Sequence, residues 1–171
     1  AFWTLVPWLV NAAMPDASAS EISAWSFLVI GVGLLGAIWG GLMSQRWGST
    51  RVAFVSLTIL GSLCVLYPWI SIAPALAMTA LMVWGFFMIA DSAQFSAISS
   101  KACDPEMVVS ALSIQYSLGF LISIGSIVLL TQWMDHLGVS VVWLLIPGPL
   151  FGLFAMRSLM TESAPDHKTT V

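Results

Sequence analysis

Charged side chains are scarce in this chain of 171 residues, since Asp, Glu, Lys and Arg together make up only 8% of it. A typical soluble domain has about 25% charged residues. Hydrophobic residues make up 59% of the chain, and a soluble protein of this size cannot bury that much apolar surface. The composition therefore excludes an ordinary soluble domain and predicts an all-α integral membrane protein.

Basic residues, histidines and cysteines are also few. The five Lys and Arg and the net charge of −3 exclude a basic surface for nucleic acid. Cys64 lies in an apolar run and Cys103 in a polar loop, so we expect two free thiols. Both histidines, His136 and His167, lie in polar segments. Metal-ligand patterns, phosphate-binding glycine loops and paired intramembrane acids are all lacking, so we expect no metal, no cofactor and no enzyme activity.

Long uncharged runs mark the expected membrane spans, because a helix needs about 20 apolar residues to cross a bilayer. The run 52–90 has about twice that length, and two prolines in the segment 67–74 divide it. We therefore predict one transmembrane domain over residues 1–160 and a polar tail over residues 161–171. The spans are expected at residues 1–12 (partial), 22–44, 52–70, 74–97, 107–131 and 138–158.

The first and last of these segments are irregular. Segment 1–12 is only half a crossing long, and it is either a truncated helix or a short interfacial segment. The chain opens on Ala1 with no Met and no basic region, so we expect a piece of a longer protein. In the segment 138–158, Pro147 and Pro149 predict a kink near the middle of the helix.

The basic residues all fall on one side of the membrane if the spans alternate in direction. They are Arg46, Arg51, Lys101, Arg157 and Lys168. The opposite loops contain no Lys or Arg, and basic loops are typical of the cytoplasmic side. We therefore expect the C-terminal tail in the cytoplasm and the protein in a plasma membrane, most simply a bacterial inner membrane.

The loop after the first full span carries a motif. Gly41, Arg46 and Gly48 match the G-x-x-x-D-R-x-G-R-[RK] loop of the major facilitator superfamily of transporters, which the segment resembles. Gln45 stands where that family has Asp, and Arg51 lies two residues beyond the family's first basic position. The resemblance implies a cytoplasmic gate loop. The alternative is a basic anchor beside a glycine turn.

The resemblance is to the second copy of the loop, which lies between helices 8 and 9 in that family. It implies a major-facilitator-like six-helix half-bundle, helices 7 to 12, with the first helix truncated. It also implies a secondary active transporter that moves a small-molecule substrate by alternating access, with the lipid bilayer and a missing amino-terminal half as partners. A small channel or an accessory membrane subunit remains the alternative.

Asp91 is the only acidic residue inside a predicted span. A charge there costs several kcal/mol unless water or a partner stabilises it. Trp84, Met88 and Gln94 share its helix face by their spacing, and Gln115 lies in the following span. Together these residues form a candidate substrate or proton site. The alternative is that Asp91 only pairs with an arginine or meets water near the membrane surface.

Small residues mark expected helix contacts. Gly36 and Gly40 are four residues apart, a spacing that lets another helix backbone approach closely. Gly119 and Ser123 repeat this spacing in the span 107–131. These positions are either ordinary packing contacts or parts of an interface that moves during transport.

Cys103 provides a test of the predicted orientation. It lies in a loop expected in the cytoplasm, so a membrane-impermeant thiol reagent applied to intact cells should leave it unlabelled and should label it after permeabilisation. Cys103→Ser, which leaves only Cys64, is the control for labelling at the second thiol. Labelling of Cys103 before permeabilisation would reverse the orientation.

Overall fold

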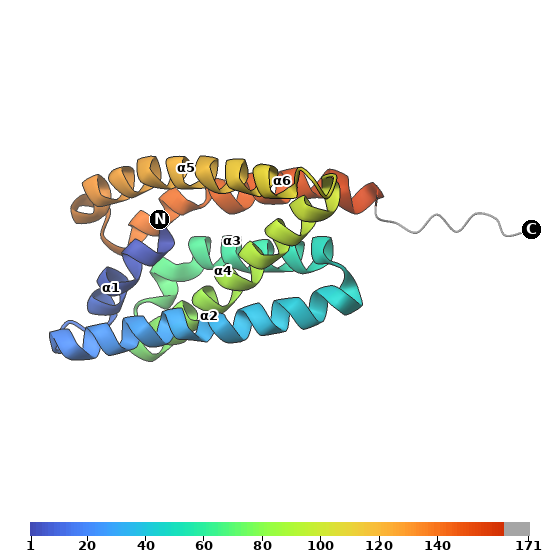
Figure 1. Ribbon diagram of the computed structural model, residues 1–171. Helices are drawn as coiled ribbons and strands as arrows, with labels where there is room; N and C mark the ends of the chain where they lie inside the picture. The colour runs from blue at the N-terminus through green and yellow to red at the C-terminus, as the bar shows by residue number, and fades with distance from the viewer. Residues whose placement is uncertain (163–171) are drawn as a thin grey trace, which may run out of the picture.

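The computed structural model describes the backbone of residues 1–162 and the side chains of residues 1–157, and over this part of the chain the secondary structure is entirely helical. The last nine residues of the expected tail lie outside the described part. The elements, labelled in Figure 1, are α1 (Phe2–Ala13), α2 (Ala19–Trp47), α3 (Ser49–Ile70), α4 (Pro74–Ala102), α5 (Val108–Leu137), the 3-10 helix η1 (Gly138–Leu145) and α6 (Pro147–Glu162). The expectation of an all-α protein is confirmed.

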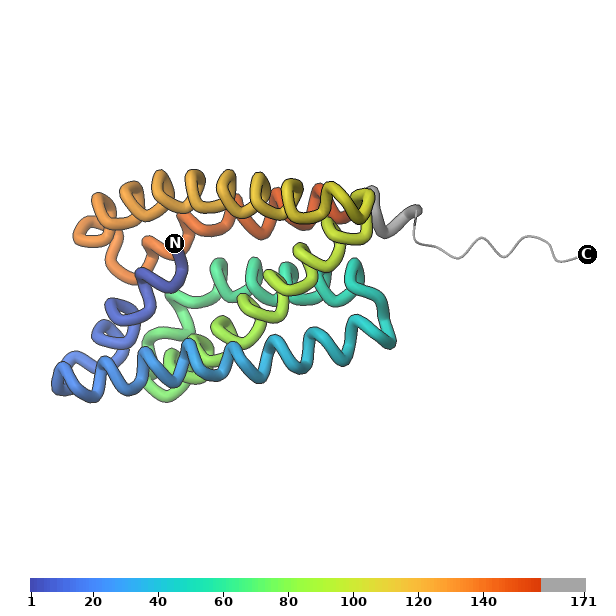
Figure 2. Tube along the Cα trace, viewed as in Figure 1, coloured from blue at the N-terminus to red at the C-terminus, as the bar shows by residue number. Residues whose placement is uncertain are grey.

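The long helices run back and forth between two ends of the molecule (Figures 1 and 2). The α2–α3 and α4–α5 connections and the end of α6 gather at one end, to the right in Figure 1. Within the described residues, every Lys and Arg lies in these segments: Arg46, Arg51, Lys101 and Arg157. We call this the basic end. The predicted clustering of basic residues is therefore present among the described residues, and Lys168 lies outside them.

Four segments are long and apolar enough to cross a membrane. Three are α2, α3 and α4, and the fourth is the 50-residue stretch Val108–Arg157, which contains α5, η1 and most of α6. The helix α1 has 12 residues and is about 18 Å long, which is shorter than the roughly 30 Å hydrocarbon core of a bilayer. The arrangement is consistent with a multi-pass membrane protein.

The structure differs from the sequence prediction after α5. A single kinked helix was expected over residues 138–158, but the chain forms η1 and then begins a new helix at Pro147. Pro147 and Pro149 lack a backbone N–H, and the first turn of a helix is where this N–H is not needed. Leu150 is the first residue after them to donate to a helical carbonyl, that of Ile146, at 3.2 Å. The prolines therefore start α6 instead of bending it.

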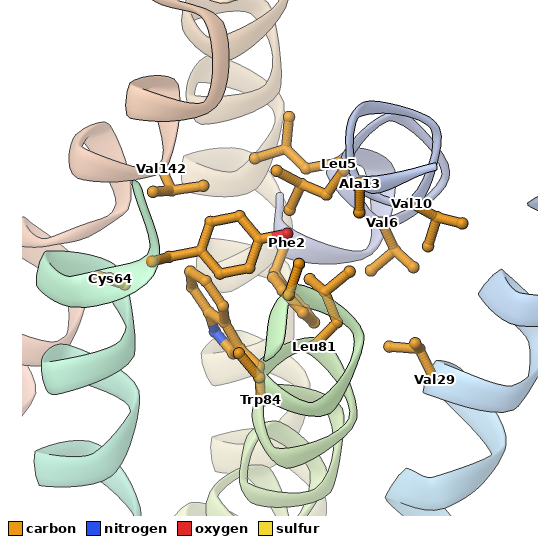
Figure 3. Packing of buried hydrophobic residues seen from close by; sticks show 14 of the residues in the cluster. Phe2, Leu5, Val6, Val10, Ala13, Val29, Cys64, Leu81, Trp84 and Val142 are labelled. Carbon is orange, nitrogen blue, oxygen red and sulfur yellow. The ribbon is translucent and has the colours of Figure 1, made fainter. Parts of the chain in front are cut away.

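The main hydrophobic core lies where α1 packs against α2, α4 and η1. Phe2, Leu5, Val6, Leu9 and Val10 are all buried. Figure 3 shows the labelled α1 side chains Phe2, Leu5, Val6 and Val10 gathered in one cluster with Leu81 and Trp84 of α4 and Val142 of η1. The first segment is thus packed into the bundle.

The helix α5 is the least covered of the long helices. Leu130 is its only buried residue. The helix α5 contacts α4 and η1, and hydrogen bonds join it to α4 near the basic end. Much of its length, including Phe120, Leu121 and Ile122, is exposed.

The helices α2 and α4 run in the same direction and meet through glycines. A Cβ atom built on Gly36 would overlap the carbonyl oxygen of Phe86 and lie 3.1 Å from the Phe86 Cα. The same holds for a glycine of α4, since a Cβ on Gly85 would overlap the carbonyl oxygen of Val29 on α2. A Cβ on Gly40 would lie 3.3 Å from the Ala90 Cα. The two backbones therefore touch, as small residues permit in membrane helices.

Leucine at Gly36 or Gly40 should destabilise the protein by about 1–3 kcal/mol, because the added side chain meets backbone that cannot move aside. Thermal unfolding of the purified protein in detergent measures the change. Gly31→Leu is the matched control, since Gly31 lies in the same helix and has no neighbour within 4 Å. Equal unfolding temperatures for the three variants would contradict the backbone contact.

Candidate functional site

The polar face of α4 lies inside the bundle. The helix begins at Pro74, where proline fits the first turn, and continues without a break to Ala102. Gln94 is 2% exposed and Asp91 is 8% exposed, while Met88 is half-buried. Asp91 and Gln94 are three residues apart and so lie about one turn apart on one side of the helix.

Both polar side chains have an oxygen without a hydrogen-bond partner among the described residues. These atoms are Oδ1 of Asp91 and Oε1 of Gln94. An unsatisfied buried polar atom costs about 1–3 kcal/mol, and more when it is charged. The expected alternative, a pairing of Asp91 with an arginine, is therefore not seen for this oxygen in the described part of the chain. Both atoms are hydrogen-bond acceptors, and no described residue donates a hydrogen bond to either of them.

A third polar atom without a partner lies at nearly the same depth on α3. Ser56 is fully buried and its Oγ has no partner among the described residues. The rings of Tyr67 and Trp84 are 5.7 Å apart, which places these two residues at one level of the antiparallel helices α3 and α4. Counting from this pair at about 1.5 Å per residue puts Ser56 within about 2 Å of the level of Gln94.

Trp84 belongs to a different environment. It is 1% exposed, and its ring stacks on Phe2 at 4.8 Å and meets Tyr67 edge-on (Figure 3). Asp91 is seven residues further along α4, a rise of about 10 Å. The structure therefore places Trp84 in the hydrophobic core, with Met88 packed against that core, and brings only Asp91 and Gln94 together.

Gln115 is also separate from Asp91. Its Oε1 accepts a hydrogen bond from the Ser99 hydroxyl, and the hydroxyls of Ser96 and Tyr116 are 2.6 Å apart. These two contacts join α4 to α5 toward the basic end. Ser99 lies eight residues, or about 12 Å, beyond Asp91. The side chain of Gln115 thus ties two helices together at a distance from the candidate site.

The predicted gate loop is shorter than its sequence suggests. Gly41, Gln45 and Arg46 all lie within α2, so only Gly48 separates α2 from α3, and Arg51 lies in the first turn of α3. Gly48 has a φ of 84°, a backbone conformation that favours glycine, and its N–H donates to the Ser44 carbonyl at 3.0 Å. The side chains of Gln45, Arg46 and Arg51 are exposed.

The two pairs of predicted packing residues have different surroundings. Gly36 and Gly40 are buried against α4. Gly119 is exposed and has no neighbour within 4 Å of a built Cβ, and Ser123 is half-buried. On α5, Gly119 therefore faces away from the described helices, whereas Ser123 is partly covered.

Two polar residues of α3, Ser56 and Tyr67, were not predicted from the sequence. The Tyr67 hydroxyl, like the Ser56 Oγ, is buried without a partner among the described residues. Both lie on a stripe of buried residues three or four apart, which the sequence contains: Ser49, Ala53, Ser56, Leu60, Cys64 and Tyr67. Serine, cysteine and tyrosine on one helical stripe were the available signal.

Comparison of the chain with known protein families, characterised proteins and solved structures finds no match. Among the described residues no group of three or more His, Cys, Asp or Glu could hold a metal ion. The site is therefore a small set of buried oxygens on α3 and α4 that have no hydrogen-bond partner among the described residues, and Asp91 is the one of these residues that can carry a charge.

The two glutamines should respond in opposite ways to loss of their amides. Gln94→Met removes an unpaired buried oxygen at nearly constant volume, so unfolding stability should stay the same or rise by about 1 kcal/mol. Gln115→Met breaks the bond to Ser99 and should lower stability by about 1 kcal/mol. Thermal unfolding of both variants makes the comparison. A larger loss for Gln94→Met than for Gln115→Met would show that Gln94 has a stabilising partner.

Proposed function

We propose that the chain is the carboxyl-terminal half of a secondary transporter of the major facilitator type, and that Asp91 binds the coupling proton. The observation that carries this proposal is the buried Oδ1 of Asp91, which has no hydrogen-bond donor among the described residues. Ionisable groups buried in membrane helices without a structural partner are typical of ion and proton pathways.

Proton binding accounts for the chemistry of the site. The unpartnered atoms of Asp91 and Gln94 are both acceptors, so these two oxygens cannot form a hydrogen bond to each other while Asp91 is ionised. A protonated carboxyl group has one O–H donor. Gln94 lies one turn away on the same helix, within reach of this donor. Protonation thus removes a buried charge and supplies the missing hydrogen bond in one step.

The glycine contact between α2 and α4 supports a coupling of this site to motion. Gln94 lies over Gly40, since a Cβ built there would be 3.2 Å from the Gln94 Nε2. Small residues let two membrane helices approach closely, with no large side chains interlocked between them. A proton shifts the balance between two conformations only if it binds them with different affinity. We expect movement of α2 against α4 to change the surroundings of Gln94 and, with them, the proton affinity of Asp91.

The remaining parts of the proposal concern the surroundings of the chain. The uncovered length of α5, with Gly119 and Ser123 on it, is suited to contact with an amino-terminal half of the same protein. The basic end is assigned to the cytoplasmic side of the plasma membrane because of its Lys and Arg. The substrate is a small molecule that binds between the two halves.

Asp91→Asn should abolish solute accumulation driven by a proton gradient and leave solute exchange largely intact, because exchange needs no net proton movement. Proteoliposomes of the full-length protein that contains this chain, loaded with a labelled solute found by screening, allow both assays. Asp135→Asn is the matched control, since Asp135 is an exposed acid at the opposite end of the bundle.

Three results would contradict the proposal. Proton-driven accumulation that is unchanged in Asp91→Asn would exclude the coupling role. A parallel loss of accumulation and exchange would indicate a structural role for Asp91. Ion conductance without saturable exchange in the unaltered protein would indicate a channel.

A further inference from the structure

Two neighbouring grooves open at the basic end of the molecule. The first, of about 330 Å³, is lined by Trp47, Arg51, Phe54 and Val55. The second, of about 440 Å³, is lined by Phe54, Leu153, Phe154 and Arg157. Phe54 lines both grooves, so they adjoin each other across α3 and α6. Asp91 and Gln94 line neither groove, so this surface is distinct from the candidate proton site.

Each groove combines one arginine with an apolar wall. On α3, Arg51 precedes Phe54 by three residues, and on α6, Arg157 follows Phe154 by three residues. Residues three apart on a helix are neighbours along its surface. Each arginine therefore lies one helical turn from a phenylalanine. In both helices the arginine is the residue nearer the basic end.

The two arginines lie at the same depth. The helices α3 and α6 are antiparallel, and a Cβ on Gly61 would lie 3.4 Å from Pro149 while one on Gly152 would lie 2.9 Å from Leu57. These contacts fix the register between the helices. Counting from them at about 1.5 Å per residue places Arg51 within about 3 Å of the level of Arg157.

Both guanidinium groups are available for a ligand. Arg51 and Arg157 are exposed, and no hydrogen bond or ion pair engages either one within the residues whose side chains the structure describes. The acids Asp104 and Glu106, in the α4–α5 connection at the same end, do not line the grooves. The site therefore presents two positive charges that have no partner among side chains 1–157, beside apolar walls.

We propose that this pair of grooves binds an anionic phospholipid. The planar guanidinium group binds phosphate oxygens through paired hydrogen bonds, and basic pockets between membrane helices bind acidic headgroups. The apolar walls extend from the arginines toward the hydrophobic middle of the helices, where acyl chains run. An inorganic phosphate ion would use the charges but not the walls of Phe54, Val55, Leu153 and Phe154.

Lipid titration of the purified chain in detergent, followed by native mass spectrometry, tests the proposal. The probes are phosphatidylglycerol, phosphatidylcholine with the same acyl chains, and inorganic phosphate. Phosphatidylglycerol should bind more tightly than phosphatidylcholine. Each of Arg51→Gln and Arg157→Gln should weaken its binding about fivefold, and the double variant about 25-fold, while binding of phosphatidylcholine stays unchanged.

Arg46→Gln is the matched control, because Arg46 is an exposed arginine at the same end that lines neither groove. It should change binding by less than twofold in the same titration, since a general charge effect is the only contribution it can make. The double lysine variant, Arg51→Lys with Arg157→Lys, should keep most of the preference for the anionic lipid. Unfolding temperatures in phosphatidylcholine check that all variants are folded.

Three outcomes would overturn the lipid site. Equal affinity for phosphatidylglycerol and phosphatidylcholine would show that the headgroup charge makes no contribution to binding. An equal loss of phosphatidylglycerol affinity in Arg46→Gln and Arg51→Gln would show that binding depends only on the net charge at this end. Displacement of phosphatidylglycerol by equimolar inorganic phosphate would show an anion site without a role for the acyl chains. None of these results bears on Asp91, so the lipid site and the transport proposal stand or fall separately.

Discussion

The backbone contact between α2 and α4 is the constraint on which the rest of the structure depends. In a bilayer, helices gain little from burying apolar surface against one another, because lipid tails are as apolar as leucine. Close packing must supply the attraction instead, and glycine allows the closest packing. Gly36 and Gly85 bring the two parallel helices together at two levels. The position of α4 then decides what its other face meets, which is α3 and, at one end, α1.

The contact between α2 and α4 also determines where the polar side chains of α4 lie. With α4 pressed against α2, the side chain of Gln94 is held over Gly40, and Asp91 is directed away from the surface. The unpartnered oxygens of Asp91 and Gln94 thus lie on the helix that this contact positions, and Ser56 lies at nearly the same level on α3. Buried polar groups destabilise a fold when they have no hydrogen-bond partner. The Ser96–Tyr116 and Ser99–Gln115 pairs, by contrast, are hydrogen-bonded and stabilise the α4–α5 contact.

Much of the fold could be predicted from the sequence, because the absence of charge over 20 residues is a strong physical signal. It located α2, α3, α4 and α5, and the basic residues predicted which ends of these helices lie together. The α6 boundary was missed because prolines in an apolar run are compatible with either a kink or a helix start.

The site was predicted only in part. Asp91 could be identified because it is the only acidic residue in the predicted spans. Gln115 and Trp84 were grouped with it only because of their positions along the predicted helices. Their actual partners, Ser99 for one and Phe2 for the other, come from helices whose relative placement depends on tertiary contacts that periodicity does not report. Ser56 lay on a regular stripe of α3 and could have been found from its spacing. The absence of a hydrogen-bond partner for its hydroxyl among the described residues is a property of the packed bundle alone.

The single residue that separates α2 from α3 has a consequence for how these two helices can move. With only Gly48 between Trp47 and Ser49, the facing ends of the helices are at most about 7 Å apart, whatever else changes. The 29 residues of α2 and the 22 residues of α3 can therefore tilt against each other about this glycine, but they cannot separate at this end. The connection between α4 and α5, which has five residues, allows their ends to lie as far as about 20 Å apart. The turn at Gly48 is thus a short tether that makes α2 and α3 move as a pair.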